Sequence, residues 1–231
     1  MVKINITWHG HACFNIDMGK QIIIDPFIEH NPVAMIRKED VKADIVVATH
    51  GHSDHVADAL YIASKNKAPL VTIVELAWLL QEKDHSVKIH DINFSGSVEI
   101  SGIKITAVPA LHSSSFEEKY AGNPGGMILS NGKVTIYHAG DTGVFSDMKL
   151  IGDLYKPDIA MLPIGGHYTM GPDGAIEAIK MINPKIVIPM HYNTFDMIKQ
   201  DASLFKKMAE ERTNSKVQLM EIEKGKEFDF K

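Results

Sequence analysis

The sequence contains a single cysteine, Cys13, and no apolar run approaching the roughly 20 residues that a bilayer-spanning helix needs. A lone cysteine cannot form an internal disulfide, and residues 1–5 lack the apolar core of a signal peptide. A block of lysine or arginine is also missing, and the formal net charge is -5. This composition argues against electrostatic capture of nucleic acid or anionic lipid. We therefore expect a cytoplasmic protein that binds neither membranes nor nucleic acid.

Linkers rich in proline, glycine or serine are absent, as are low-complexity segments and short-period repeats. At 231 residues the chain is long enough to bury a substantial hydrophobic core. We therefore expect one domain over residues 1–231. The composition is compatible with a homo-oligomer.

Short β-branched apolar runs predict the strands of the fold. They cover residues 22–24, 45–47, 70–73, 103–106, 134–136, 159–162 and 186–188. Helical spacing of apolar residues predicts helices over 56–66, 74–82, 173–181 and 196–210. Residues 4–25 and 86–137 instead indicate consecutive strands joined by tight turns. The mixture predicts an α/β (α+β) fold in which two packed sheets are flanked by helices.

Histidine is over-represented, with 12 residues, and several of the histidines and aspartates follow predicted strands. The residues at or just after strand ends are Asp25, His50, His112, His138, Asp141, His167 and His191. Ligand sites in α/β sheets form outside the carboxyl ends of the strands. We therefore expect these residues to converge on one edge of the fold.

The segment with the strongest chemical signal is the HxHxDH motif of His50, His52, Asp54 and His55. Residues two apart in an extended chain face the same way, so His50 and His52 can bind one ion while Asp54 and His55 turn toward another. Imidazole nitrogens and carboxylate oxygens suit zinc, and also manganese, nickel or iron. A solvated polar loop is the alternative, but the pattern arises by chance with a probability on the order of 10⁻³.

Four ligands do not complete a site for two ions, so more must come from other strand ends. His112, Asp141 and His191 are the natural suppliers, because each follows an apolar run and lies beside flexible or turn-forming residues. A hydrogen-bonded loop residue is the alternative for each one taken alone. Their shared position after strands favours metal ligation.

The motifs together resemble the metallo-β-lactamase superfamily. The resemblance lies in HxHxDH, a histidine about sixty residues later, an aspartate in Gly140-Asp141-Thr142 and a histidine toward the last third of the chain. Residues 8–14, Asp25-Pro26 and residues 165–171 are similar to those of small metal-dependent hydrolases related to ascorbate-6-phosphate lactonase. The resemblance covers nearly the whole chain and implies a four-layer αββα sandwich.

The resemblance also implies how the ligands are shared between two divalent ions. One ion would be bound by His50, His52 and His112, and the other by Asp54, His55 and His191. Asp141 would bridge the two ions. Asp25 would hold the free N–H of a ligand histidine, as ligating imidazoles require, although an Asp-Pro pair is also a common turn starter. His11 is expected to support a ligand in the same way, without touching the metal.

Two cations roughly 3.5 to 4 Å apart lower the pKa of a shared water to about 7 and polarise the bond under attack. The expected reaction is therefore hydrolysis of a small ester, lactone or phosphodiester by a bridging hydroxide. Asp54 would steer this nucleophile. The loop of Gly166, His167 and Tyr168 would contact the substrate, with His167 as a candidate proton donor or a substrate contact only.

Three other functions are weighed against this one. A metal-dependent nuclease normally carries an added arm or basic surface for its substrate, which this chain lacks. Diiron oxidases with this pattern typically have a glutamate in place of His52 and a flavin-binding domain, so iron-dependent redox chemistry is also disfavoured. A non-catalytic binding protein would have lost ligands, and none of the expected ones is missing. The expected partner is therefore a small-molecule substrate.

Overall fold

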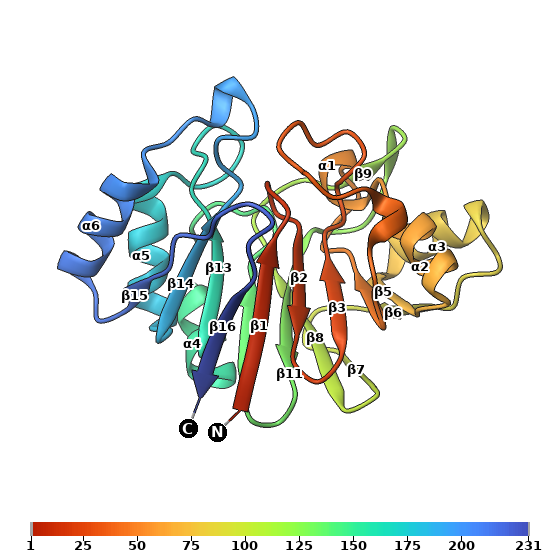
Figure 1. The fold of residues 1–231 in the computed structure, drawn as a ribbon, viewed down its shortest axis with the longest axis horizontal. Helices are drawn as coiled ribbons and strands as arrows, with labels where there is room; N and C mark the ends of the chain where they lie inside the picture. Colours follow the sequence, from red (N-terminus) through yellow and green to blue (C-terminus); the bar gives the residue numbers. More distant parts are fainter. Residues whose placement is uncertain (1, 231) are drawn as a thin grey trace.

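The computed structural model describes residues 2–230, which form two seven-stranded sheets packed face to face (Figure 1). The first sheet contains β16 (Lys226–Phe230), β1 (Val2–Trp8), β2 (Phe14–Asp17), β3 (Gln21–Ile24), β4 (Ile45–Val47), β5 (Leu70–Ile73) and β6 (Ile89–Ile92), in that order. The second contains β15 (Lys216–Val217), β14 (Ile186–Met190), β13 (Ile159–Pro163), β12 (Thr135–His138), β11 (Gly125–Ser130), β8 (Ile103–Pro109) and β7 (Ser97–Ile100). A short hairpin, β9 (Ser115–Phe116) and β10 (Lys119–Tyr120), stands apart from both.

Helices cover the outer face of each sheet, which confirms the expected four-layer αββα sandwich (Figure 1). The helices are α1 (Ser53–Val56), α2 (Ala59–Asn66), α3 (Val74–Lys83), α4 (Met148–Tyr155), α5 (Pro172–Ile182) and α6 (Ala202–Arg212), with 3-10 turns η1 (Lys38–Asp40) and η2 (Asp196–Ile198). α2 and α3 pack on β4 and β5, and α4 to α6 lie on the second sheet. Within residues 2–230, no helix has both the length and the apolar character needed to cross a bilayer.

The uninterrupted apolar runs of the central strands follow from this layering. Ile22 and Ile24 of β3 belong to the core between the two sheets, whereas Ile23 faces the second core, under α2 and α3. Val46 and Val47 of β4 divide between the two cores in the same way. Because side chains alternate across a strand, a strand covered on both faces needs apolar residues at every position.

Two of the predicted helices have different bounds in the structure. The helix predicted over 56–66 is divided into α1 and α2, and the one predicted over 196–210 is wrong in its first half. There the chain forms only η2, and α6 begins at Ala202 because the Asp201 carboxylate accepts hydrogen bonds from the backbone N–H groups of Ser203 and Leu204. The sequence analysis assigned no helix to the α4 segment.

Parallel strands bring the chemically active segments to one edge. β3 to β6 run parallel to one another, as do β12 to β15. β8 has the same direction as β12, because both are antiparallel to β11, which lies between them. The carboxyl ends of β3, β4, β8, β12 and β14 therefore open on the edge that carries the histidines and aspartates.

Candidate metal centre

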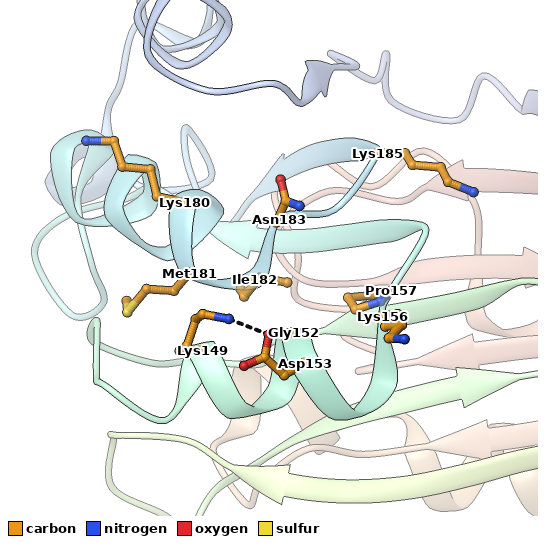
Figure 2. A pocket seen from close by; sticks show the side chains of 10 residues that line it. All are labelled: Lys149, Gly152, Asp153, Lys156, Pro157, Lys180, Met181, Ile182, Asn183 and Lys185. Atoms are coloured by element: carbon orange, nitrogen blue, oxygen red, sulfur yellow. Dashed lines mark hydrogen bonds and ion pairs between the residues drawn. The ribbon is translucent and has the colours of Figure 1, made fainter.

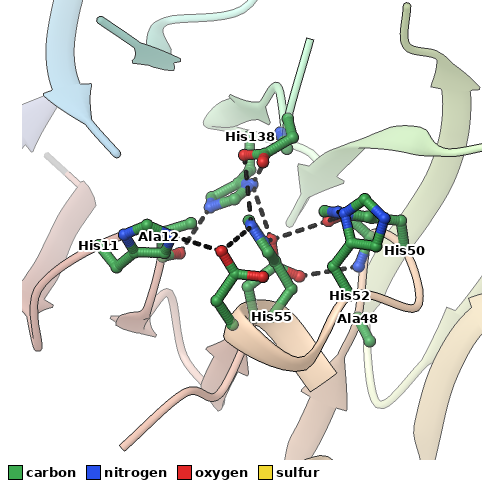
Figure 3. A network of polar contacts seen from close by, with 12 residues as sticks. His11, Ala12, Ala48, His50, His52, His55 and His138 are labelled. Carbon is green, nitrogen blue, oxygen red and sulfur yellow. Dashed lines mark hydrogen bonds and ion pairs between the residues drawn. The ribbon is translucent and has the colours of Figure 1, made fainter. Parts of the chain in front are cut away.

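The structure brings all seven residues of the expected ligand set to this edge. Figure 3 shows His50, His52 and His55 there, with His11 beside them. They fall into groups whose donor atoms lie within 4.8 Å of one another. The first group is His50, His52 and His112, and the second is His11, Asp54, His55 and His191. A third group, His50, His55 and Asp141, connects the other two. The residues that the resemblance assigned to each ion thus lie together, and His11 joins the second group.

Asp141 occupies the middle of the cluster. Its Oδ1 lies 3.3 Å from Nε2 of His55. Its Oδ2 lies 3.0 Å from Nε2 of His191 and 3.5 Å from Nε2 of His112. The two oxygens of one carboxylate therefore reach both ligand groups, which is the placement that a bridging ligand requires.

Asp25 orients one histidine of each ligand group. It contacts His55 directly and reaches His50 through Thr49. It accepts hydrogen bonds from Nδ1 of His55 and from the hydroxyl of Thr49, both at 2.8 Å, and from the Thr49 backbone N–H at 2.8 Å. Because the Thr49 hydroxyl donates to Asp25, its oxygen accepts from Nδ1 of His50 at 3.0 Å. Both rings are thereby fixed with Nε2 facing the cluster, the arrangement that metal-ligating histidines need. The sequence analysis missed Thr49, and only its position between the β4 run and His50 could have pointed to it.

Replacing Thr49 by valine tests this relay. We expect Thr49→Val to lower affinity for the ion of the first group by about 10- to 100-fold, because the His50 ring loses its fixed orientation. The matched control is Thr72→Val, since the Thr72 hydroxyl is also buried but donates to the backbone oxygen of Ala48. Calorimetric titration of zinc into the metal-free variants measures both affinities. Equal affinities in the two variants would exclude an orienting role for Thr49.

Buried atoms without hydrogen bonds show that the cluster fits metal ions. Nε2 of His55, Oδ1 of Asp141 and both ring nitrogens of His191 are buried and make no hydrogen bond within the described residues. Their nearest polar neighbours are one another, since Nε2 of His55 and Nε2 of His191 lie at ion-pair distance from Asp141. These atoms are nitrogen and carboxylate donors of the kind that zinc, manganese, nickel and iron accept. The donor set therefore fits divalent metal ions.

The electrostatics keep His50 and Asp141 in the forms that bind metal, but keep His55 protonated until an ion binds. Burial, reinforced by the neighbouring His55, holds the pKa of His50 well below its usual value, so this ring is neutral at pH 7. Burial alone would raise the pKa of Asp141, but His55 and His191 outweigh it and hold that pKa well below its usual range. Burial lowers the pKa of His55, yet Asp141, with Asp25 and Asp54, outweighs it and holds that pKa well above the usual value. A metal ion therefore displaces a proton from His55 and meets a carboxylate that is already ionised.

His11 lies closer to the cluster than the sequence indicated. Its Nε2 is 3.0 Å from Oδ2 of Asp54, its Nδ1 is 3.0 Å from the hydroxyl of Thr194, and its ring centre is 3.9 Å from that of His191. Its backbone adopts the left-handed region, with φ of 57°. His11 thus holds Asp54 through Nε2, and it would act as a ligand only by giving up one of these two hydrogen bonds. Thr194 is a further residue that sequence reasoning did not find.

Burial lowers the pKa of His11 from 6.5 to about 4. The unfolded chain therefore takes up this proton first, so the contribution of His11 to stability is complete above pH 6.5 and is lost as the pH falls toward 4. The unfolding free energy of the metal-free wild type should fall between pH 7.5 and pH 4.5. In metal-free His11→Gln we expect this fall to be smaller by about 2 to 3 kcal/mol. Urea unfolding in the presence of a chelator measures this difference. Parallel pH dependences in the two proteins would contradict it.

The cluster opens into two adjoining cavities. One, of about 260 Å³, is lined by His52, Asp54, His112, Ser113, Asp141, Tyr168 and His191. The other, of about 590 Å³, shares His52 and Asp54 and extends to Phe116 and Glu117 of the β9–β10 hairpin. Of the loop expected to contact substrate, Tyr168 lines the smaller cavity, whereas Gly166 and His167 are exposed and line neither. The His167 ring lies beside Tyr168, with centroids 4.5 Å apart.

Two further buried histidines, His9 and His138, have structural contacts. Nδ1 of His9 lies 2.8 Å from the carboxylate of Glu223, and Nε2 of His138 donates to the backbone oxygen of Ala12 at 2.9 Å. Burial raises the pKa of the Cys13 thiol far above its usual value. Cys13 is therefore a small buried apolar residue and not a nucleophile.

The two packed sheets carry a cluster of histidines and aspartates at the carboxyl ends of their strands. This arrangement is typical of metalloenzymes, and comparison with known proteins identifies the family. The model of the β-lactamase superfamily domain matches residues 5–191. The chain belongs to this superfamily and is a metal-dependent hydrolase.

Relatives and solved structures agree with this assignment. The chain is 51% identical to a UPF0173 metal-dependent hydrolase of Thermoplasma volcanium, over 90% of this chain and 92% of that protein. It is 44% identical to one of Methanosarcina mazei, over 95% and 96% of the two chains. The structure matches Igni18, a metallo hydrolase from Ignicoccus hospitalis, with a TM-score of 0.91, 38% identity and coverage of 99% and 100%.

Proposed function

We propose that the protein uses a centre of two divalent ions, with hydroxide shared between them, to cleave a small ester, lactone or phosphodiester. The observation that carries this proposal is the position of Asp141, whose two oxygens lie within 3.5 Å of nitrogen donors from both ligand groups. Zinc suits the donor set of imidazoles and carboxylates best, and manganese, nickel and iron are the alternatives.

The ligand groups assign each residue a place in this centre. His50, His52 and His112 would hold one ion, and Asp54, His55 and His191 the other, with Asp141 between them. When bound, such a pair of ions makes hydroxide available near neutral pH and polarises the bond that is attacked. The protein supplies the fixed geometry, because Asp25 orients the rings of His50 and His55.

Asp54 has a second task at the cavity surface. Its side chain is 31% exposed, and it lines both cavities while His11 holds Oδ2. The other carboxylate of the cluster, Asp141, is almost fully buried. Asp54 is therefore the carboxylate that can orient an incoming water. Tyr168 would contact the substrate in the smaller cavity, which it lines. We do not assign the proton-donor role to His167, because it lines neither cavity.

Metal removal and replacement test this function. Purified protein is stripped with a chelator, reloaded with zinc, manganese, nickel or iron, and assayed against esters, lactones and phosphodiesters. We expect no hydrolysis by the metal-free protein and recovery on adding a divalent ion. Oxygen consumption by the iron form without hydrolysis by any form would replace this function with redox chemistry.

A further inference from the structure

We infer that the substrate is an uncharged ester or lactone with an apolar acyl group, bound at an apolar mouth beside the metal centre. This inference rests on the proposed function and narrows its substrate class. The reaction is simple hydrolysis: water adds to the carbonyl carbon, the acyl C–O bond breaks, and the leaving oxygen takes a proton. The products are a carboxylic acid and an alcohol.

The first observation is the absence of cationic side chains from the site. No residue that lines either of the two cavities is lysine or arginine. Outside the metal-ligand set, the only charged side chain in the lining is that of Glu117, which is acidic. Sites that recognise phosphate or carboxylate groups normally present arginine or lysine to them. Glu117 is itself paired with Lys83, which lines neither cavity, so an anionic substituent remote from the reacting bond would find no cationic side chain in the lining.

Lysines do gather around another cavity, shown in Figure 2, but it lies at the amino ends of the strands. Lys149, Lys156, Lys180 and Lys185 line a cavity of about 480 Å³ between α4 and α5. Lys156 and Lys185 lie just before β13 and β14, at the amino ends of these strands, whereas the metal centre is at the carboxyl ends. Three of the four lysines are also paired with acidic neighbours, Asp153, Glu177 and Asp158. This positive cavity cannot assist binding at the metal centre.

The second observation is a set of apolar side chains around the entrance. We define the apolar mouth as Phe116 and Tyr168, which line the cavities, together with Phe195 and Met197, which are exposed but line neither cavity. Phe116 lines the larger cavity and Tyr168 the smaller one. The Tyr168 hydroxyl lies 3.7 Å from Sδ of Met197, and the Phe195 ring is 5.6 Å from that of His11. Met197 therefore adjoins Tyr168, and Phe195 adjoins His11 of the second ligand group.

Three members of this mouth are exposed although they are large and apolar, whereas Phe116 is half-buried and packs against the core under α2 and α3. Tyr168 is 56% exposed, Met197 53% and Phe195 41%. An exposed apolar patch beside a polar reactive centre is typical of a ligand-binding surface. An acyl chain whose carbonyl reaches the metal centre would cover these side chains. Each methylene buried in this way raises binding about fourfold.

Methyl esters of increasing acyl length test the inference on the metal-loaded protein. From methyl acetate to methyl butanoate, which differ by two methylenes, we expect kcat/KM to rise at least tenfold. Monomethyl succinate has the length of the butanoate ester but ends in a carboxylate. Its kcat/KM should be at least tenfold lower than that of methyl butanoate. A pH-stat follows all three reactions. A flat series, or preference for the succinate, would overturn the inference.

A matched pair of variants locates the effect. Met197→Gln should abolish the rise with acyl length, whereas Leu154→Gln should keep it. Leu154 is likewise apolar and 64% exposed, but lies on α4, away from the mouth. Saturation-transfer NMR of 2-heptanone with the metal-free proteins gives a readout independent of turnover. Its alkyl signals should appear with the wild type and Leu154→Gln and vanish with Met197→Gln. Equal signals in the two variants would refute the mouth as the binding surface.

The outcomes also separate this inference from the proposed function. No metal-dependent turnover of any ester or phosphodiester would remove the proposed function, while the NMR comparison would still decide whether the mouth binds apolar ligands. Metal-dependent cleavage of bis(4-nitrophenyl) phosphate faster than any ester would uphold the function and overturn the uncharged substrate. A change of oligomeric state in Met197→Gln, with the acyl-length series unaltered, would show that the mouth binds a second copy of the chain instead.

Discussion

Replacing Asp141 by asparagine is expected to reduce kcat/KM by about 10³-fold or more. The substitution removes the charge of the carboxylate that reaches both ligand groups, at 3.3 Å from His55 and 3.0 Å from His191. Metal ions contribute several kcal/mol to stabilising the charge that develops during hydrolysis, and about 4 kcal/mol corresponds to 10³-fold in rate. Asparagine keeps the shape of the side chain, so the loss reports on the charge and not on packing.

The control for this variant is Asp158→Asn. Asp158 is also a largely buried carboxylate, with 15% side-chain exposure, and it accepts hydrogen bonds from Lys185 and from the backbone of Thr135. Its substitution should lower stability and leave the kinetics of the folded protein unchanged. A full complement of metal and undiminished turnover in Asp141→Asn would contradict a bridging role for Asp141.

Replacing one histidine of either ligand group should remove the ion of that group and leave the other ion bound. His112→Ala is expected to lose the ion of the first group and His191→Ala that of the second, since each variant leaves the donors of the other group in place. Because both ions act on the same bond, each variant alone should lower kcat/KM by about 10³-fold, and the double variant should fall little further. Elemental analysis of the dialysed proteins counts the ions. Additive losses in the double variant would show that the two groups act independently.

The strands were readable from the sequence because both faces of each central strand are covered. Runs such as 22–24, 45–47 and 186–188 lack polar alternation, and the structure places them in β3, β4 and β14. Each of these strands packs against the other sheet on one face and against helices on the other. The start of α6 was not readable from apolar spacing. Spacing in residues 196–210 continues across Asp201, but the capping carboxylate sets the first helical residue.

The candidate ligands were readable because strand ends in such folds share an edge, whereas their supporting contacts were not. Thr49 is one of many threonines in the sequence, and its relay from His50 to Asp25 exists only once β3 and β4 are paired. His11 meets Asp54 across 43 positions of sequence. Such contacts depend on side-chain directions that neither spacing nor composition encodes.

Backbone strain at the centre was also beyond the sequence. His11, Asp25 and His191 all adopt the left-handed region, with φ of 57°, 48° and 54°. Side chains other than glycine adopt this region at a cost on the order of 1 kcal/mol, and such residues cluster at functional sites. Here the conformation turns three polar side chains toward one cluster directly after their strands or turns.

The central claim is that two ions bind on either side of Asp141. Anomalous diffraction from crystals of the protein loaded with zinc tests it most directly. The account predicts two peaks, one contacting His50, His52 and His112 and the other contacting Asp54, His55 and His191, with Asp141 reaching both. A fully active protein with a single peak, or with peaks that Asp141 does not touch, would contradict it.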